Sequence, residues 1–246
     1  MRTALLSDIH GNREALAACL AHIERNPVDR IMFTGDIVGY GADPVWCLET
    51  VMRHCDRGAI SLLGNHDEAV TRLDCDMNAL ARTAIEWTRT QLNAEHRAFI
   101  DAMPILVEEG ETLFVHSSAA SPRAWHYITN KREADASLRY TKKRVTICGH
   151  VHRPCFFHAM DGRPIEEFVP PHGVPIPLLR ARRWVLVLGS VGQPRDGIPA
   201  AAYSVFDSAQ GRITMHRVAY DMETAARKIR AAGLPAKLAD RLYTGS

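Results

Sequence analysis

The sequence lacks the features that mark membrane proteins and small disulfide-bonded domains. No apolar stretch approaches the length of a membrane-spanning helix, and the first residues run straight into a strand-like segment without an apolar leader. None of the 6 cysteines is paired with another at the two-residue spacing of a zinc knuckle or a redox motif. We therefore expect reduced thiols and a cytoplasmic protein that does not enter a membrane.

The sequence also lacks a strong charge of either sign. Its 30 lysines and arginines face 28 acidic residues, the net charge is +2, and the basic residues are dispersed along the chain. This balance disfavours a nucleic acid as partner and gives no argument for binding to a membrane surface. Nothing in the sequence indicates an oligomeric state.

What is present is the composition of an ordinary globular protein, with 46% hydrophobic and 24% charged residues over 246 positions. The first half alternates predicted strands (2–7, 30–33, 59–63) with predicted helices (12–25, 44–55, 77–103). This order indicates an α/β architecture with a largely parallel sheet. We expect one domain over residues 1–246.

The second half is rich in strands. Strands are predicted at 105–107, 112–115, 145–148, 155–159, 184–188, 202–206 and 213–218, before two closing helices at 222–232 and 235–243. The segment 164–177 carries five prolines, and we expect it to be an irregular excursion on the surface.

Polar residues follow the ends of five predicted strands. These motifs are Asp8-Ile9-His10, Gly35-Asp36, Gly64-Asn65-His66-Asp67, His116 and Gly149-His150-Val151-His152. Sites in open α/β sheets form outside the carboxyl ends of the strands, so parallel neighbouring strands would bring these residues to one rim. Residues two apart on extended backbone also point the same way. Singly, each motif is typical of a surface turn, but together they indicate a metal site.

The types of side chain suggest which ions the site would hold. Oxygen and imidazole donors without thiolates suit manganese, iron, zinc, nickel or magnesium, and these types do not rank the ions. The candidates are too many for one tetrahedral ion and fit two divalent ions that share Asp36, with one carboxylate oxygen on each. The predicted ligands are Asp8, His10, Asp36, Asn65, His116, His150 and His152.

This series of motifs resembles the calcineurin-like metallophosphoesterase superfamily, and residues 189–196 with the closing helices resemble a small bacterial single-domain branch of it. The resemblance implies a four-layer α-β-β-α sandwich of two mixed sheets flanked by helices. It implies one metal held by Asp8, His10, Asp36 and His152. It implies a second metal held by Asp36, Asn65, His116 and His150.

The resemblance also implies roles for residues that do not bind metal. His66 would face the phosphoryl group, Asp67 would position the His66 ring, and Asn12 would touch a phosphate oxygen. Arg123 and Arg195 are candidates for bidentate binding of a distal phosphate, although ordinary surface ion pairs explain such arginines equally well.

Aromatic residues and one departure from the family pattern bear on the substrate. Tyr40 and Trp125 could stack on a nucleobase, but isolated aromatics more often serve packing. Gly39-Tyr40-Gly41 stands where protein Ser/Thr phosphatases carry Asp-Arg-Gly, which argues against a protein phosphatase.

We therefore expect a dinuclear phosphoesterase that hydrolyses a phosphate mono- or diester by in-line attack of a metal-bridging hydroxide. Its partner would be a phosphorylated small molecule such as a nucleotide. The alternative is a dinucleoside polyphosphate or cyclic-nucleotide hydrolase. A non-catalytic scaffold of the same fold ranks lower because all the predicted ligands and His66 are present.

Overall fold

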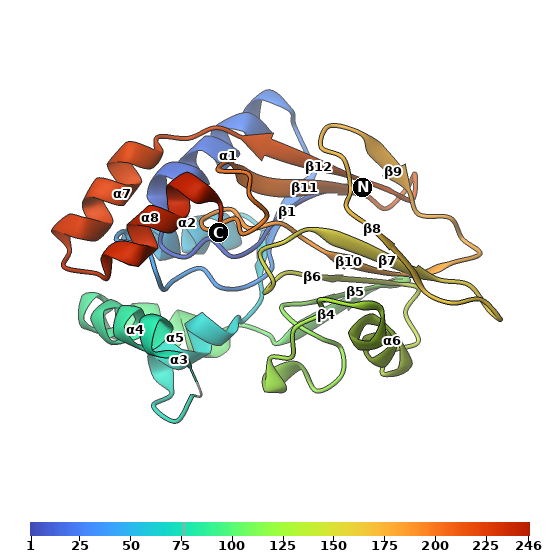
Figure 1. The fold of residues 1–246 in the computed structure, drawn as a ribbon, viewed down its shortest axis with the longest axis horizontal. Helices are drawn as coiled ribbons and strands as arrows, with labels where there is room; N and C mark the ends of the chain where they lie inside the picture. Colours follow the sequence, from blue (N-terminus) through green and yellow to red (C-terminus); the bar gives the residue numbers. More distant parts are fainter. Residues whose placement is uncertain (76) are drawn as a thin grey trace.

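The computed structural model describes residues 1–75 and 77–246, and these residues form two facing sheets of six strands each (Figure 1). The first sheet has the order β3-β2-β1-β11-β12-β9. Its strands are β1 (Arg2–Leu6), β2 (Arg30–Phe33), β3 (Ile60–Ser61), β9 (Pro175–Pro177), β11 (Ala201–Asp207) and β12 (Arg212–Val218).

The second sheet has the order β4-β5-β6-β10-β7-β8. Its strands are β4 (Leu106–Glu109), β5 (Thr112–Val115), β6 (Val145–Cys148), β7 (Cys155–Ala159), β8 (Glu166–Phe168) and β10 (Arg183–Val187). The helices are α1 (Arg13–Arg25), α2 (Pro44–Cys55), α3 (Asn65–Thr71), α4 (Ala79–Gln91), α5 (Ala94–Ala102), η1 (Pro122–Ala124), α6 (Lys131–Arg139), α7 (Met222–Ala231) and α8 (Ala236–Thr244).

Both sheets are mixed, so the prediction of one largely parallel sheet is corrected. Strands β1, β2 and β3 are parallel in the first sheet, and β5, β6 and β10 are parallel in the second. The remaining pairs in both sheets are antiparallel. Only β1, β2 and β3 follow the predicted alternation of strands and helices. Most later connections are too short to carry the chain back to a parallel neighbouring strand.

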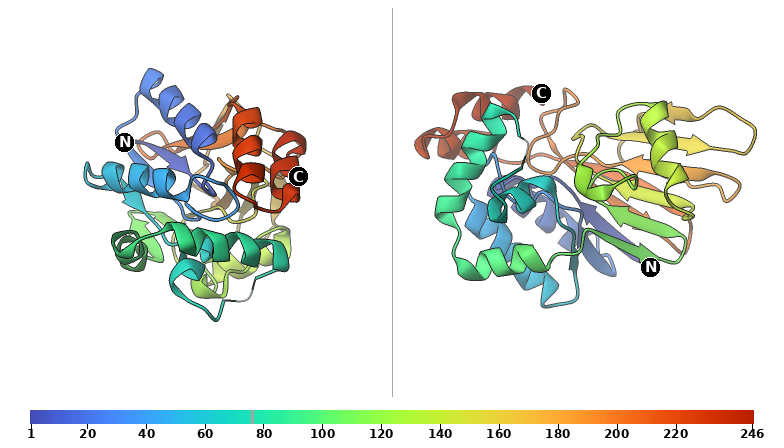
Figure 2. Two further views of the ribbon diagram at one scale, coloured as in Figure 1. Left: turned by 90° about the vertical axis from the view of Figure 1, so that its left-hand side faces the viewer. Right: turned by 90° about the horizontal axis from the view of Figure 1, so that it is seen from below.

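Apolar side chains from both sheets fill the space between them. Leu5 and Met32 of the first sheet and Phe114 and Leu186 of the second belong to one buried cluster. On the outer faces, α1 packs on β11 and β12, while α6 packs on β7 and β10. The two further views show helices on both outer sides of the paired sheets (Figure 2). The four-layer sandwich implied by the family resemblance is therefore confirmed.

Local signals explain most of the helix boundaries. The predicted helical region at 77–103 divides into α4 and α5, since Asn93 accepts a hydrogen bond from the His96 N–H and caps α5. Helix α2 begins with Pro44 in its first turn, as predicted. Helices α3 and α6 are absent from the sequence-based expectations. The described residues contain no helix that is both long and apolar enough to cross a bilayer.

The proline-rich segment is more regular than expected. Residues 164–177 contribute β8 at the edge of the second sheet and β9 at the edge of the first. Proline is tolerated on such edges because one side of an edge strand needs no ladder hydrogen bonds. The segment lies at the surface as expected, but its expected irregularity is corrected, since its two short strands join the edges of the two sheets along one side.

Candidate metal centre

The predicted motifs meet at the carboxyl ends of parallel strands, but these strands belong to two different sheets. The loops after β1, β2 and β3 come from the first sheet, and those after β5 and β6 come from the second. Backbone hydrogen bonds join the loops beyond the strand ends, from Asp8 N–H to Gly35 O (3.0 Å), from His10 N–H to Asp36 O (2.9 Å) and from Gly149 N–H to His116 O (2.9 Å).

The backbone at this rim has an unusual conformation. Among the described residues, eight that are not glycine have a positive φ, and five of these are predicted ligands: Asp8, His10, Asp36, His150 and His152. Such conformations cost free energy and persist where the surrounding structure enforces them, commonly at functional sites. The strained backbone coincides with the residues that the motifs single out.

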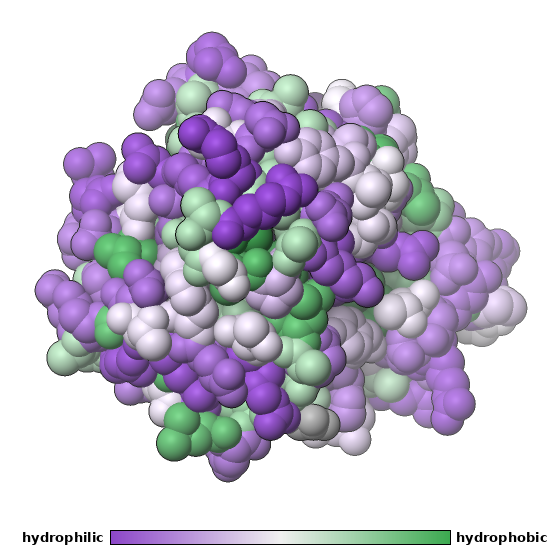
Figure 3. Space-filling view, turned by 60° about the vertical axis from the view of Figure 1, so that its left-hand side comes forward, coloured by the Kyte–Doolittle hydropathy of each residue, from purple (hydrophilic) through white to green (hydrophobic). Residues whose placement is uncertain are grey.

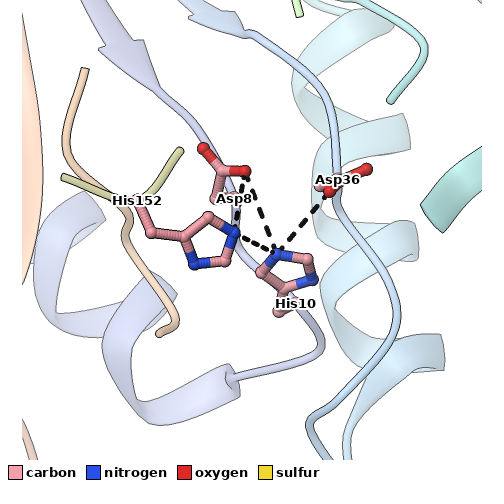
Figure 4. A group of neighbouring side chains, drawn as sticks. All are labelled: Asp8, His10, Asp36 and His152. Atoms are coloured by element: carbon pink, nitrogen blue, oxygen red, sulfur yellow. Dashed lines mark hydrogen bonds and ion pairs between the residues drawn. The ribbon is translucent and has the colours of Figure 1, made fainter. Parts of the chain in front are cut away.

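Four of the predicted ligands form what we call the inner group, namely Asp8, His10, Asp36 and His152 (Figure 4). All four are buried, with at most 2% of each residue exposed. Their donor atoms lie within 4.8 Å of one another. His152 Nε2 lies 3.2 Å from Asp8 Oδ1 and 3.0 Å from His10 Nε2.

Asp36, Asn65, His116 and His150 form the outer group. Donor atoms of Asp36, His116 and His150 also lie within 4.8 Å of one another. Asn65 and His150 line the same cavity of about 380 Å³. The side-chain oxygen of Asn65 is buried and has no hydrogen-bond partner within the described residues, so it is free to accept a cation.

Backbone carbonyls fix which nitrogen of each imidazole faces the centre. The Nδ1 atoms of His10, His116 and His152 lie 2.7–3.1 Å from the carbonyls of Val38, Thr34 and Gln193. A carbonyl only accepts, so each Nδ1 must donate, and each Nε2 keeps its lone pair for a metal. His150 is reversed, because its Nε2 donates to Trp125 O (2.8 Å) and Nδ1 is left as the donor atom for a metal.

Asp36 lies between the two groups. Its Oδ1 accepts the His66 N–H at 2.8 Å, whereas Oδ2 lies 3.7 Å from His10 Nε2 and 3.3 Å from His116 Nε2. The expectation that each oxygen serves one ion is therefore corrected: the same oxygen, Oδ2, faces both groups. Gly64 is required here, since a Cβ atom at this position would collide with Asp36.

The charges and pKa values of the buried side chains at the rim favour the binding of cations. Burial lowers the pKa of His150 to about 3 and places that of His10 well below its usual value, so both rings are neutral and able to bind metal. Burial opposes a charge on His116 as well, but Asp36 outweighs it and raises the pKa of His116 to about 9. The buried carboxylates, the neutral rings of His10 and His150 and the free Asn65 oxygen fit divalent cations, and the His116 ring would give up its proton to bind one.

His66 lies beside the predicted ligand His10, and no hydrogen bond joins its ring to Asp67 within the described residues. The Asp67 carboxylate accepts the N–H groups of Ile37 (2.9 Å), Val38 (3.1 Å) and Gly64 (3.1 Å). Asp67 therefore ties the loop after β2 to the loop after β3. The predicted pairing with the His66 ring is wrong because both oxygens already serve the backbone.

The His66 ring is held by packing. Its centroid lies 4.5 Å from that of Tyr40 and 4.7 Å from that of His10. Its Nδ1 is buried against Gly39 and, in the part of the chain that is described, has no hydrogen-bond partner. Burial lowers the pKa of His66 to about 4, which favours the neutral form of the ring.

The loop that carries Arg123 and Trp125 closes the outer group. Glu68, which is 6% exposed, binds the guanidinium of Arg123 and accepts the Trp125 Nε1–H at 2.9 Å. Tyr127 stacks on His150 with centroids 4.1 Å apart. Arg123 therefore lines the cavity but is already paired, and Trp125 anchors the loop. The sequence singled out Arg123 and Trp125 as candidate substrate contacts but missed Glu68 and Tyr127, although Glu68 directly follows the Asn65 motif.

Asn12 and Arg195, the two other residues predicted to contact the substrate, differ in whether their side chains already have structural partners. Asn12 caps α1, accepting the Ala15 N–H (3.1 Å), and donates to Gly192 O (2.8 Å). Its side chain thus has structural partners, and its contact with phosphate stays a prediction. Arg195 lies over Tyr40, 5.6 Å from the ring centroid, near the inner group.

Comparison with known proteins agrees with this geometry. The model of the calcineurin-like phosphoesterase superfamily domain matches residues 1–211. A metallophosphoesterase structure from Sphaerobacter thermophilus has a TM-score of 0.88 and 35% identity, covering 100% of this chain and 99% of that one. An uncharacterized protein of Methanocaldococcus jannaschii is 35% identical over 98% of this chain and 97% of its own length.

A further relative has a named activity. A symmetrical bis(5'-nucleosyl)-tetraphosphatase of Actinobacillus pleuropneumoniae is 37% identical over 157 residues, or 56% of this chain and 53% of that enzyme. This match spans about half of the curated enzyme's length. Together with the family match and the buried Asp and His groups, these findings lead to one conclusion: the chain belongs to the calcineurin-like phosphoesterase superfamily and is a phosphoric ester hydrolase.

Proposed function

We propose that the chain hydrolyses phosphate mono- or diesters at a centre of two divalent metal ions. The inner and outer groups would each hold one ion and share Asp36. The position of Asp36 Oδ2, 3.7 Å from His10 Nε2 and 3.3 Å from His116 Nε2, carries this proposal. When bound, two such ions supply an activated water for in-line attack and neutralise charge on the phosphoryl oxygens.

The chain's own residues orient the substrate and support the centre. His66, as a neutral imidazole, can donate a hydrogen bond to a phosphoryl or leaving oxygen. Packing against Tyr40 and His10 limits its motion. Asp67 acts on the site indirectly. Its carboxylate accepts backbone N–H groups and so positions the loops that carry Asp36 and Asn65.

A second candidate function is hydrolysis of a dinucleoside polyphosphate. The observation that favours it is the 37% identity to a bis(5'-nucleosyl)-tetraphosphatase. The cavity of about 380 Å³ beside the outer group gives room for an organic part of such a substrate. Arg72 and Arg123 on its rim both pair with Glu68, which leaves this side nearly balanced in charge.

The test is a panel of substrates on protein stripped of metal and reloaded with each ion in turn. The panel contains a chromogenic phosphate monoester, a chromogenic diester and diadenosine tetraphosphate. We expect hydrolysis only in the reloaded protein, with about two ions per chain by elemental analysis. Hydrolysis by the stripped protein, or none with any ion, would contradict the proposal. The preferred member of the panel decides between the two candidate functions.

A further inference from the structure

The C-terminal helices reach the edge of the inner group. The family model ends at residue 211, whereas β12, α7 and α8 follow it. Ile229 of α7 and Leu242 of α8 pack in one buried cluster with Tyr40. They also line a small pocket together with Tyr40 and His10. A part of the chain outside the family model therefore reaches the inner group.

Arg195 presents a largely unpaired guanidinium at this edge. Its backbone N–H donates to His152 O at 3.1 Å, which places it directly beside a predicted ligand. Its Nη2 donates to the neutral amide oxygen of Gln193 at 3.0 Å. Its Nε is buried and, within residues 1–75 and 77–246, has no hydrogen-bond partner. A buried donor of this kind points to a missing acceptor.

Arg241 lies in the last turns of α8, on the same side. The turn after α8 is fixed to the loop that follows Arg195, since the Gly197 N–H donates to Gly245 O (2.8 Å) and the Gly245 N–H donates to Arg241 O (2.9 Å). Burial and the neighbouring charge of Arg195 lower the pKa of Arg241. The hydrogen bonds between the two turns hold the loop of Arg195 next to the end of α8 that carries Arg241, and the lowered pKa agrees with this placement.

The acidic residues next in sequence do not neutralise this pair. Asp196 pairs with Arg217, and Asp240 pairs with Arg230 at 2.8 Å. Throughout the described residues, no carboxylate lies within 4.0 Å of the Arg195 or Arg241 side-chain nitrogens. The cavity rim on the opposite side differs, since its arginines share Glu68. Figure 3 shows this end of the molecule, where strongly hydrophilic residues border one side of a hollow whose other borders are less hydrophilic.

We infer that Arg195 and Arg241 form a subsite for a second phosphate group of the substrate, next to the phosphate that is hydrolysed. Two guanidinium groups without a carboxylate partner repel each other, and a phosphate between them would accept several of their N–H donors. The preferred substrate class is then a phosphoanhydride or a compound with two phosphates. This inference rests on the proposed function, because it assigns the substrate class of the same site.

The test compares two competitive inhibitors on the metal-loaded full chain, inorganic phosphate and methylenediphosphonate, with a chromogenic monoester as substrate. We expect the wild type to prefer methylenediphosphonate. Arg241→Gln and Arg195→Gln should each reduce that preference by about tenfold. Arg227→Gln removes the same charge from exposed α7 and should keep the preference. Circular dichroism melts show whether each variant is folded, and Arg241→Lys should restore part of the preference.

An unchanged preference in Arg241→Gln, or an equal loss for both inhibitors, would overturn the inference. If no monoester is hydrolysed, the proposed function fails by itself, and the inhibitor preference is then measured as a ratio of dissociation constants by calorimetry. A preference that depends on Arg241 in that measurement would support the subsite independently of turnover.

Discussion

The inner and outer groups hold similar side chains but differ in how they meet the rest of the molecule. The inner group is sealed beneath Tyr40 and the C-terminal helices, and its imidazoles donate to backbone carbonyls within the motif loops. The outer group borders the cavity, and His150 depends on the Trp125 loop, which Glu68 holds in place. The difference suggests that the inner group retains an ion while the outer group admits the substrate.

Replacing the residue that both groups share should have the largest effect. Asp36→Asn removes the charge of the oxygen that faces both groups. We expect both ions to be lost and kcat/KM to fall by roughly a thousandfold or more. Elemental analysis and steady-state kinetics measure these effects. Asp135→Asn on α6 makes the same change at an exposed carboxylate and should alter neither. Two ions retained in Asp36→Asn would show that Asp36 is not shared.

Replacing one predicted ligand of the inner group or one of the outer group should show whether each group binds its ion separately. In His152→Ala we expect the inner ion to be lost, and in Asn65→Ala only the outer ion, because their donor atoms face different groups. Each should lower kcat/KM by roughly a hundredfold or more. Titration with a metal indicator gives the number of ions bound. If either variant loses both ions at once, the two groups are a single cooperative site and the comparison fails.

His66 should affect turnover without affecting metal content. His66→Ala removes a hydrogen-bond donor beside the centre but no predicted ligand, so kcat should fall by roughly a hundredfold. The number of ions, measured by elemental analysis, should stay at the wild-type value. Loss of metal in this variant would mean that His66 stabilises the metal ligands and does not act on the substrate.

Glu68 tests whether the outer group depends on its loop. Glu68→Gln weakens the hold on Arg123 and Trp125, which in turn positions His150. We expect kcat/KM to fall by about tenfold, in the range typical for residues behind a metal ligand, with the inner ion retained. Glu108→Gln, at an exposed carboxylate of β4, is the matched control. Equal loss of both ions would contradict the separate roles of the two groups.

The smallest effect concerns Asn12, where capping and phosphate binding can be separated. Asn12→Ala removes a helix cap and the bond to Gly192, so we expect the free energy of unfolding to fall by about 2 kcal/mol. Asn130→Ala removes only the cap of α6 and should cost about 1 kcal/mol. Urea unfolding measures both. A raised KM in Asn12→Ala would support the phosphate contact, and an unchanged KM would contradict it.

The sequence was sufficient for most of the elements and for the set of residues at the rim, but not for α3, α6, the edge strands β8 and β9, or the pairing of the strands. Apolar runs located β2 and α2 at their observed bounds, because periodicity and Pro44 act locally. They could not show that β1 and β6 belong to different sheets, since strand pairing depends on contacts far apart in the chain. Residues 164–177 were misread because proline excludes central strands but not edges.

The same limit explains the errors at the site. The five motifs identified buried residues whose donor atoms approach each other. This was possible because each motif directly follows a strand, and the ends of these strands meet at one rim. The direction of Asp67 and the state of His66 depend on neighbours from other loops, such as Val38 and Gly39. The clamp of Glu68 on the Trp125 loop joins residues 57 positions apart, for which the sequence carries no pattern.

The proline-rich segment and the rim of the candidate site link the two sheets at places far apart. On one side the chain passes from β8 to β9, from the edge of one sheet to the edge of the other. At the rim, an ion held by Asp8 and His152 would be a cross-link between the loop of β1 and the loop of β6, and so between the layers. Since an ion that binds only the folded chain stabilises it by mass action, chelation should lower the melting temperature and loosen the sandwich first at this end.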